Sequence, residues 1–170
     1  MNIREWNPQE GGAFQGDVCL WPVPANIEIS TLDEIAPRDR RLVLLDGEIS
    51  GHAHAISLDP SFGRAKNFRP ADASVADPFA AASPALRKRL AGGTAAKVNV
   101  RMYRDAAAAQ AMVKAGILER ADLMVGFLVI DGEPVVLRHQ EHDPIRIPAG
   151  TYYCGRQVES VGAEERRVAD

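Results

Sequence analysis

The sequence predicts a mostly β domain, either a β-barrel or a β-sandwich, with two or three short helices. Short runs that alternate apolar and polar residues are separated by Gly, Pro and Asp-Gly pairs, which is typical of strands and turns. Asp46-Gly47 and Asp131-Gly132 each lie between apolar runs, and this pattern predicts two hairpins. The chain has 170 residues, enough to form a single domain over 1–170 with its own core.

The first forty residues predict little regular structure besides one strand. Residues 1–16 indicate an irregular or edge segment. The apolar run GDVCLWPVP at 16–24 predicts a strand that lies at an edge or ends early, because proline cannot donate a ladder hydrogen bond. In STLDEIAP, at 30–37, Thr31 and Glu34 fit a capping box and predict a short helical turn.

The middle of the chain predicts a hairpin followed by a long loop. RRLVLLDGEISGHAHAISL, at 40–58, indicates strand, tight turn and strand. Residues 59–80 are polar and contain prolines without a clear period, so they predict a loop. The segment SPALRKRLAGG at 83–93 predicts a short helix that Ser83 caps, and AAKVNVRMY at 95–103 predicts a strand.

The C-terminal part predicts a helix and then three strands. DAAAAQAMVKAG at 105–116 is the clearest helix of the chain, because an Asp cap precedes an alanine-rich run and glycine ends it. Residues 122–159 contain three apolar strand candidates with Asp131-Gly132 as the first turn. The charged tail at 160–170 is expected to be peripheral. Because both Asp-Gly turns precede a strand that leads into paired histidines, two related halves are a further possibility.

Composition excludes some classes of function. A formal net charge of −3 and a pI of about 5.8 argue against a general nucleic-acid binder, because phosphate affinity comes mainly from clustered Lys and Arg. No stretch has the apolar length of a membrane span, and the polar N-terminus does not resemble a signal peptide. We therefore expect a cytoplasmic protein. Cys19 and Cys154 are expected to be buried thiols. Small-molecule or protein partners and a homo-oligomer are left open.

All four histidines occur in two close pairs. His52 and His54 lie two residues apart in a predicted strand, so they share a face that continues into apolar Ile56 and place the pair at the mouth of the interior. The second pair, His139 and His142, is spaced by three, and the two imidazoles can converge only if the chain bends, which Asp143-Pro144 favours.

This arrangement favours a metal site. A His-x-His pair with distant histidines and a carboxylate is a common way to hold a divalent transition metal such as Zn, Fe, Mn or Ni. The metal could activate water or oxygen, so the sequence predicts a metal-dependent hydrolase or oxidase. The carboxylate candidates are Glu141 and Glu48. The expected metal ligands are His52, His54, His139 and His142.

Two alternatives do not need a metal. Two histidines can act as general base and general acid, and with an arginine to hold an anion they would form a phosphodiesterase-like or RNase-like site. The expected catalytic residues are His52, His139 and Glu141. The anion-binding candidates are Arg138, Arg146, Arg101 and Arg104. In the second alternative, the chain is a non-catalytic accessory or assembly subunit.

Two resemblances arise at these residues. GHAH at 51–54 and IPAG at 147–150 resemble the two motifs of cupins, small barrels that hold a metal with histidines and a carboxylate. Here the second histidine pair precedes the Pro-x-Gly, so the resemblance implies only barrel-like architecture. GEISGHAH at 47–54 and HQEHDPIRIPAGTYYCGRQ at 139–157 are similar to a family of small uncharacterised bacterial proteins with GHxH and HxxHxPIxLPxGxY elements. That family implies which residues matter and no particular reaction.

Overall fold

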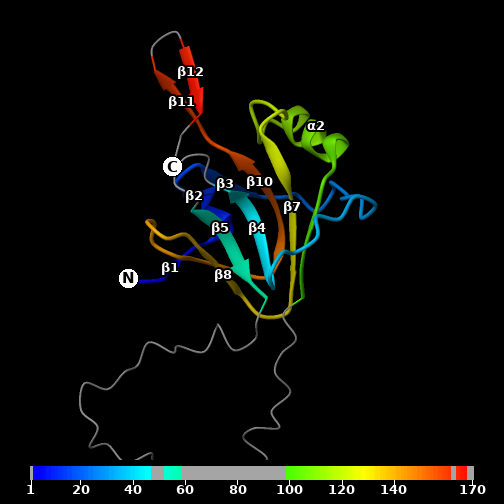
Figure 1. The fold of residues 1–170 in the computed structure, drawn as a ribbon. Helices are drawn as coiled ribbons and strands as arrows, with labels where there is room; N and C mark the ends of the chain where they lie inside the picture. Colours follow the sequence, from blue (N-terminus) through cyan, green and yellow to red (C-terminus); the bar gives the residue numbers. More distant parts are fainter. Residues whose placement is uncertain (1, 47–51, 59–98, 162–163, 168–170) are drawn as a thin grey trace, which may run out of the picture.

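Two five-stranded β-sheets form the body of the protein (Figure 1). The computed structural model describes residues 2–46, 52–58, 99–161 and 164–167. Within these residues the chain is mostly β, as the sequence predicts, and it contains one α-helix. The strands form two separate sheets rather than a closed barrel.

The first sheet, here called the histidine sheet, has the strand order β1-β9-β8-β5-β4. Its strands are β1 (Arg4–Glu5), β9 (Ile145–Ile147), β8 (Val135–Arg138), β5 (Ala53–Ser57) and β4 (Arg41–Asp46). Neighbouring strands are antiparallel except for β1, which pairs parallel with β9. The central pair β5–β8 aligns Ala55 with Arg138, and this register brings the two histidine-bearing segments together.

The second sheet, here called the helix-covered sheet, has the order β2-β3-β10-β7-β6 and is antiparallel throughout. Its strands are β2 (Ala13–Gln15), β3 (Val18–Pro22), β10 (Gly150–Arg156), β7 (Met124–Asp131) and β6 (Asn99–Tyr103). A separate hairpin of β11 (Val158–Val161) and β12 (Glu164–Arg167) follows β10 and projects beyond the two sheets (Figure 1).

The main core lies between the two sheets. Alternating side chains of each strand enter it, for example Leu42 and Leu44 of β4, which are 1% and 2% exposed. Both sheets contribute fully buried residues, including Ile56, Leu137, Leu20 and Leu128. Burying such a side chain stabilises the fold by about 1.5–3 kcal/mol, so this shared core holds the sheets face to face.

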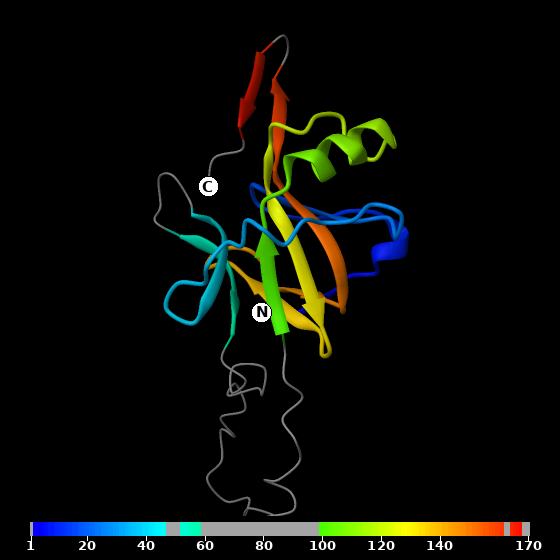
Figure 2. The ribbon, with the colours of Figure 1, turned by 90° about the vertical axis from the view of Figure 1, so that its right-hand side faces the viewer.

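A second core lies on the outer face of the helix-covered sheet, under helix α2 (Ala106–Lys114) (Figure 2). The helix begins where the Asp105 carboxylate accepts a hydrogen bond from the Ala108 N–H, and Gly116 follows its end with a φ of +73°. The prediction of this helix is confirmed. Its buried residues pack against β3, β7 and β10 through Cys19, Phe127 and Tyr153. This sheet is therefore covered on both faces.

The predicted helical turn at 30–37 is wrong. Its backbone groups bond to the region of β6 instead: the Ile35 N–H donates to the Met102 carbonyl, and the Arg104 N–H donates to the Asp33 carbonyl. Glu34 makes an isolated bridge with Tyr103. Pairing along the edge of β6 holds this segment in an extended conformation, which excludes the helical turn that the capping box would have begun. The other short helix that the structure describes is the 3-10 turn η1 (Pro8–Glu10).

The Asp131-Gly132 turn is confirmed, but the hairpin that it predicted is wrong. Gly132 has a φ of +89°, which suits glycine, and β8 follows the turn. However, β7 belongs to the helix-covered sheet and β8 to the histidine sheet, so the turn carries the chain across the core. The first hairpin, β4–β5, lies within one sheet. The two Asp-Gly units are therefore not equivalent, and the expected pair of related halves is wrong.

The remaining expectations have mixed outcomes. The strand at 16–24 ends early at Pro22, as predicted, although β3 lies inside its sheet with β2 at the edge. The region at 122–159 forms β7, β8, β9 and β10, one strand more than predicted, before β11 begins. The loop at 59–80 and the helix at 83–93 lie outside the described residues. None of the helices that the structure describes is long and apolar enough to cross a membrane.

Candidate functional site

Strand β5 separates two chemical environments. His54 and Ile56 point into the core and are 0% exposed, whereas Ala53, Ala55 and Ser57 point to the outer face of the histidine sheet. The inner face therefore carries a histidine, and the outer face carries only small side chains. Each face contributes to a different part of the candidate site.

The inner face brings the four imidazole rings together. The His54 and His139 rings are stacked, with centroids 4.2 Å apart and planes 18° apart. The His142 ring lies nearly parallel to both of these rings, with its centroid 4.7 Å from that of His139 and 6.1 Å from that of His54, and the His52 ring meets His139 edge-on at 5.8 Å. The convergence of the second pair follows from the end of β8 at Arg138, after which the chain bends.

His54 has a protein oxygen next to each ring nitrogen. Its Nδ1 lies 3.0 Å from Gln15 Oε1, and its Nε2 lies 2.7 Å from Asp17 Oδ1. The Gln15 amide is held in this orientation because its Nε2 donates to the carbonyl oxygen of Asp143 at 2.8 Å. The Gln15 Oε1 atom can only accept, so Nδ1 of His54 carries a hydrogen, and Nε2 faces the Asp17 carboxylate.

The contact between His54 and Asp17 lies inside the core. Asp17 is 6% exposed and His54 is 0% exposed, so an isolated charge on either residue would be costly. The Gln15 oxygen pairs with Nδ1 of the ring, whereas Asp17 approaches Nε2 at an ion-pair distance without a hydrogen bond of good geometry. We describe Gln15, His54 and Asp17 together as the buried triad.

His139 has a defined tautomer. Its Nδ1 accepts a hydrogen bond from the backbone N–H of Glu141 at 3.2 Å, so Nδ1 carries no hydrogen and the neutral ring is protonated on Nε2.

These hydrogen bonds bear on the predicted metal site. Within the described residues, no group of three or more His, Cys, Asp or Glu side chains is arranged to hold a metal ion. A metal-ligating histidine binds through one nitrogen and donates from the other. Both nitrogens of His54 face protein oxygens, and Nδ1 of His139 accepts rather than donates. Two of the four expected ligands are therefore not positioned to bind a metal in this arrangement.

The other two histidines are more accessible. The His52 side chain is 31% exposed, and its Nδ1 lies 3.4 Å from Oε1 of Glu141, which is 57% exposed. His142 is half-buried. The structure thus places His52, His139 and Glu141, the three residues expected to be catalytic, next to one another. The Glu141 carboxylate can orient the His52 imidazole.

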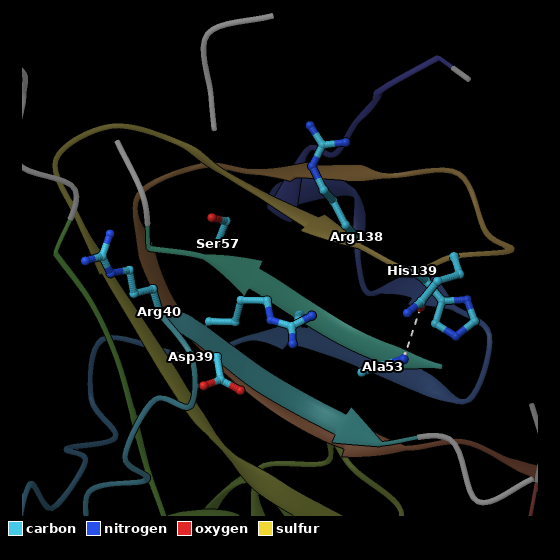
Figure 3. Close-up of a pocket in the computed structure, with 9 residues that line it drawn as sticks. Asp39, Arg40, Ala53, Ser57, Arg138 and His139 are labelled. Atoms are coloured by element: carbon cyan, nitrogen blue, oxygen red, sulfur yellow. Dashed lines mark hydrogen bonds between the residues drawn. The ribbon is translucent and has the colours of Figure 1, made fainter. Parts of the chain in front are cut away.

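The outer face of β5 forms the floor of a cavity of about 330 Å³, here called the arginine trough (Figure 3). Small side chains on β5 leave space between the longer side chains of β4 and β8. Figure 3 shows Arg138 on one side, Asp39 and Arg40 on the other side, and His139 at one end. The trough is lined by Asp39, Arg40, Arg41, Ala53, Ala55, Ser57, Arg138, His139 and Gln140.

A strained turn presents one wall of the trough. Arg38 and Arg41 exchange two backbone hydrogen bonds of 2.8 Å, and the intervening Asp39 and Arg40 have φ values of +49° and +57°. Two residues with positive φ form the turn that suits a two-residue hairpin, and it usually contains glycine or asparagine. An arginine with positive φ costs about 1 kcal/mol or more, and such strain is often found at functional positions.

The trough contains one of the four arginines expected to bind an anion. Arg138 lines it, whereas Arg146 pairs with Glu5 through a 2.9 Å contact farther along the same sheet. Arg101 and Arg104 lie on or next to β6 of the helix-covered sheet. Arg40 and Arg41 were missed because a short basic run such as 38–41 is usually a solvated surface.

No pattern in the sequence indicates that Gln15 and Asp17 are partners of His54 in the buried triad. They lie in and after the short strand β2, about 40 residues before His54, and neither residue belongs to a recognisable motif. An Asp or a Gln near the end of a strand is usually exposed, so its assignment to a site requires evidence that its side chain is buried. Only the packing of the two sheets supplies that information.

Both cysteines are buried, as expected. Burial raises the pKa of the Cys19 thiol from 9.0 to about 11, and it raises the pKa of Cys154 well above 9.0. The Cys19 thiol donates to the Gly155 carbonyl at 3.4 Å. Neutral, buried thiols are poor nucleophiles, so neither cysteine has the character of a catalytic thiolate.

Comparison with known proteins gives no family for the chain. No protein-family model matches it, and searches of curated proteins and of solved structures found no significant match. The resemblances to cupins and to the GHxH family therefore stay predictions. The fold and the site define a two-sheet β protein that has an arginine-lined cavity on one sheet and the buried triad of Gln15, His54 and Asp17 in its core.

The tautomers of the buried rings can be measured directly. We expect ¹⁵N chemical shifts of labelled imidazoles to show a protonated Nδ1 for His54 and a neutral ring protonated on Nε2 for His139 near pH 7. The His54 assignment follows from its two acceptor neighbours and that of His139 from the Glu141 N–H. A His54 ring with an unprotonated Nδ1 would contradict the proposed orientation of Gln15.

Removal of Asp17 should be strongly destabilising. In Asp17→Ala, the His54 Nε2 loses its acceptor in the core, and breaking a buried pair of this kind typically costs about 3–5 kcal/mol. The free energy of unfolding in urea measures the effect. Asp33→Ala is the matched control, because Asp33 makes only a 3.7 Å exposed contact with Arg104 and should change stability by less than about 1 kcal/mol. Equal effects of the two substitutions would argue against the buried triad.

The cysteines predict an alkaline limit to stability. A folded-state pKa of about 11 for Cys19, above its ordinary value of 9.0, means that stability is complete below pH 9 and is lost as pH rises toward 11, because the unfolded chain releases the proton first. We expect the free energy of unfolding to fall between pH 9 and 11, and to fall less steeply in Cys19→Ser. At pH 8, both thiols should react with a disulfide reagent only after unfolding. Rapid reaction of the folded protein would contradict their burial.

Proposed function

We propose that the protein binds a small phosphate ester in the arginine trough, and that His139 at the end of the trough and its neighbour His52 carry out acid–base chemistry on it. The observation that carries this proposal is that three arginines and a histidine line one cavity of about 330 Å³. A cavity of this size lies at the lower end of the range for small-molecule sites.

The lining favours an oxyanion as ligand. A guanidinium group presents a planar fork of N–H donors that matches phosphate and carboxylate oxygens two at a time. Arg40 and Arg41 come from the turn before and the start of β4, and Arg138 comes from the end of β8, so arginines line the trough on both sides of β5. Ser57, on the floor, adds a hydroxyl.

The histidines supply groups for proton transfer. His52 lies beside the trough residue Ala53, and its ring is 31% exposed with the Glu141 carboxylate 3.4 Å from Nδ1. A carboxylate that orients an imidazole is the arrangement that activates a general base. His139 lines the trough and contacts the His52 ring at 5.8 Å. We assign the base to His52 and its orientation to Glu141, with His139 between the trough and the buried triad.

This proposal differs from the metal-dependent hydrolase or oxidase that the sequence first favours. A metal held by all four histidines would require His54 to give up Gln15 or Asp17, and His139 to change tautomer. The acid–base alternative uses these residues as they stand. The hydrogen bonds of the two buried rings therefore support a metal-independent site.

Binding can be tested with inorganic phosphate as the probe. We expect a titration followed by backbone amide NMR to shift the signals of Ser57 and Gln140, and Arg138→Gln to weaken binding about tenfold or more through loss of one charge-assisted contact. Arg104→Gln is the matched control, because Arg104 pairs with Asp33 away from the trough, and it should bind like the parent protein. Equal losses in both variants would contradict a site in the trough.

Turnover is tested separately with p-nitrophenyl phosphate and bis(p-nitrophenyl) phosphate. We expect hydrolysis of at least one of them to persist in EDTA and to fall about 100-fold in His52→Gln. Elemental mass spectrometry of the untagged protein provides the contrast. About one equivalent of a tightly bound transition metal, with activity that EDTA removes, would overturn the metal-independent mechanism.

A further inference from the structure

We propose that two copies of the chain associate through the outer edges of strand β12, so that two β11–β12 hairpins join into one four-stranded antiparallel sheet. Two independent features of the hairpin support this surface: its separation from the two large sheets and the order of charged residues along β12. None of the residues that line the arginine trough belongs to the hairpin, so the surface is independent of the proposed function.

The first feature is that the hairpin forms a sheet of its own. β11 pairs antiparallel with β12, from Val158 opposite Arg167 to Val161 opposite Glu164. Figures 1 and 2 show this hairpin projecting beyond the body of the protein. An isolated two-stranded hairpin is only marginally stable in water, and additional strands stabilise it. A second copy of the hairpin would supply such strands.

β12 is an edge strand without the usual protection of an edge. Within the described residues it has a strand on one side only, so its other edge offers backbone N–H and C=O groups to another chain. The edges of the two large sheets differ from it. β1 has two residues and β2 has three, a bulge between Val43 and Leu45 interrupts β4, and residues 33–35 bond along β6. Short strands, bulges and covering segments are common ways to prevent pairing between edges.

The second feature is the order of charges in β12, which reads Glu-Glu-Arg-Arg over Glu164–Arg167. We consider antiparallel pairing of this strand with its own copy about a two-fold axis between positions 165 and 166. Glu164 then lies opposite the partner's Arg167, and Glu165 lies opposite the partner's Arg166. By symmetry, all four positions oppose residues of opposite charge. Opposite charges at directly opposed positions stabilise an antiparallel pair.

The same order of charges selects one register and one edge. A slip of one residue would place Glu165 opposite the partner's Glu165, or Arg166 opposite the partner's Arg166, and parallel pairing in register would oppose like charges throughout. The edge of β11 contains one charged residue, Glu159, and a copy of β11 has no basic residue to oppose it. The charges therefore favour a closed, two-fold symmetric dimer through β12.

The size of the paired edge predicts a reversible dimer. A strand of four residues in each copy forms few backbone bonds, so we expect association that depends on protein concentration rather than an obligate dimer. Charges at an exposed edge are screened by salt, so the dimer should weaken as ionic strength rises. Sedimentation velocity of the full chain, over a wide range of protein concentrations in low and high NaCl, measures both effects. The expected species has twice the mass of one chain.

Two double variants of identical composition test the order of charges. Glu165→Arg/Arg167→Glu opposes like charges at all four positions, and we expect it to weaken the dimer by about tenfold or more. Glu164→Arg/Arg167→Glu is the matched control, because it keeps opposite charges at all four positions in a different order, and it should dimerise like the parent protein. Both variants preserve the net charge, and both keep Glu159 opposite Arg166 within the hairpin.

Backbone amide NMR of the parent protein locates the interface without any substitution. Dilution should shift the signals of residues 164–167 and leave those of β4 unchanged. The spectra of both variants should retain the signals of the two large sheets, which separates loss of pairing from loss of folding. A parent protein that stays monomeric at every concentration would overturn the proposal. Equal dimerisation of the two variants, or dilution shifts at β4 in place of β12, would also overturn it.

Discussion

The buried contacts of His54 with Gln15 and Asp17 are the constraint on which the rest of the structure depends. His54 belongs to the histidine sheet, whereas Gln15 is the last residue of β2 in the helix-covered sheet and Asp17 immediately precedes β3. These contacts join the two sheets by directional bonds inside an otherwise apolar core. Because an unsatisfied imidazole or carboxylate there would cost several kcal/mol, the bonds specify how the sheets face each other.

The same bonds determine the chemistry above them. Gln15 also donates to the Asp143 carbonyl, so it holds the bend that follows β8 and carries His139, Glu141 and His142. This bend places the Glu141 N–H at His139 Nδ1 and the Glu141 carboxylate near His52. Gln15, which belongs to the helix-covered sheet, thus helps to position the accessible histidines although it does not line the trough. A change at Gln15 would alter the site through His54 and the bend together.

Much of the fold could be predicted from local pattern. The alternation in AHAIS at 53–57 indicates that His54 and Ile56 share the inner face, and Asp105 with its alanine run indicates α2; both predictions are confirmed. The failures came from long-range contacts. The segment that begins at Thr31 pairs with the backbone of β6 and does not form the helical turn that the capping box predicts. The Asp131-Gly132 turn leads the chain from the helix-covered sheet into the histidine sheet. The grouping of the histidines was suggested by their pairing, but Gln15, Asp17, Arg40 and Arg41 became candidates only through tertiary structure.

The alternation of β5 also bears on how such a protein could change during evolution. Positions 54 and 56 serve the core, and positions 53, 55 and 57 serve the trough, in a single five-residue strand. Substitutions on the outward positions alter the depth and polarity of the trough without repacking the interior, so they are separated from the stability of the fold. The proposed binding preference can therefore change at three alternate positions while the inward positions between them stay under selection for folding. A strand of this kind allows the lining of a surface cavity to change during evolution while the fold is kept.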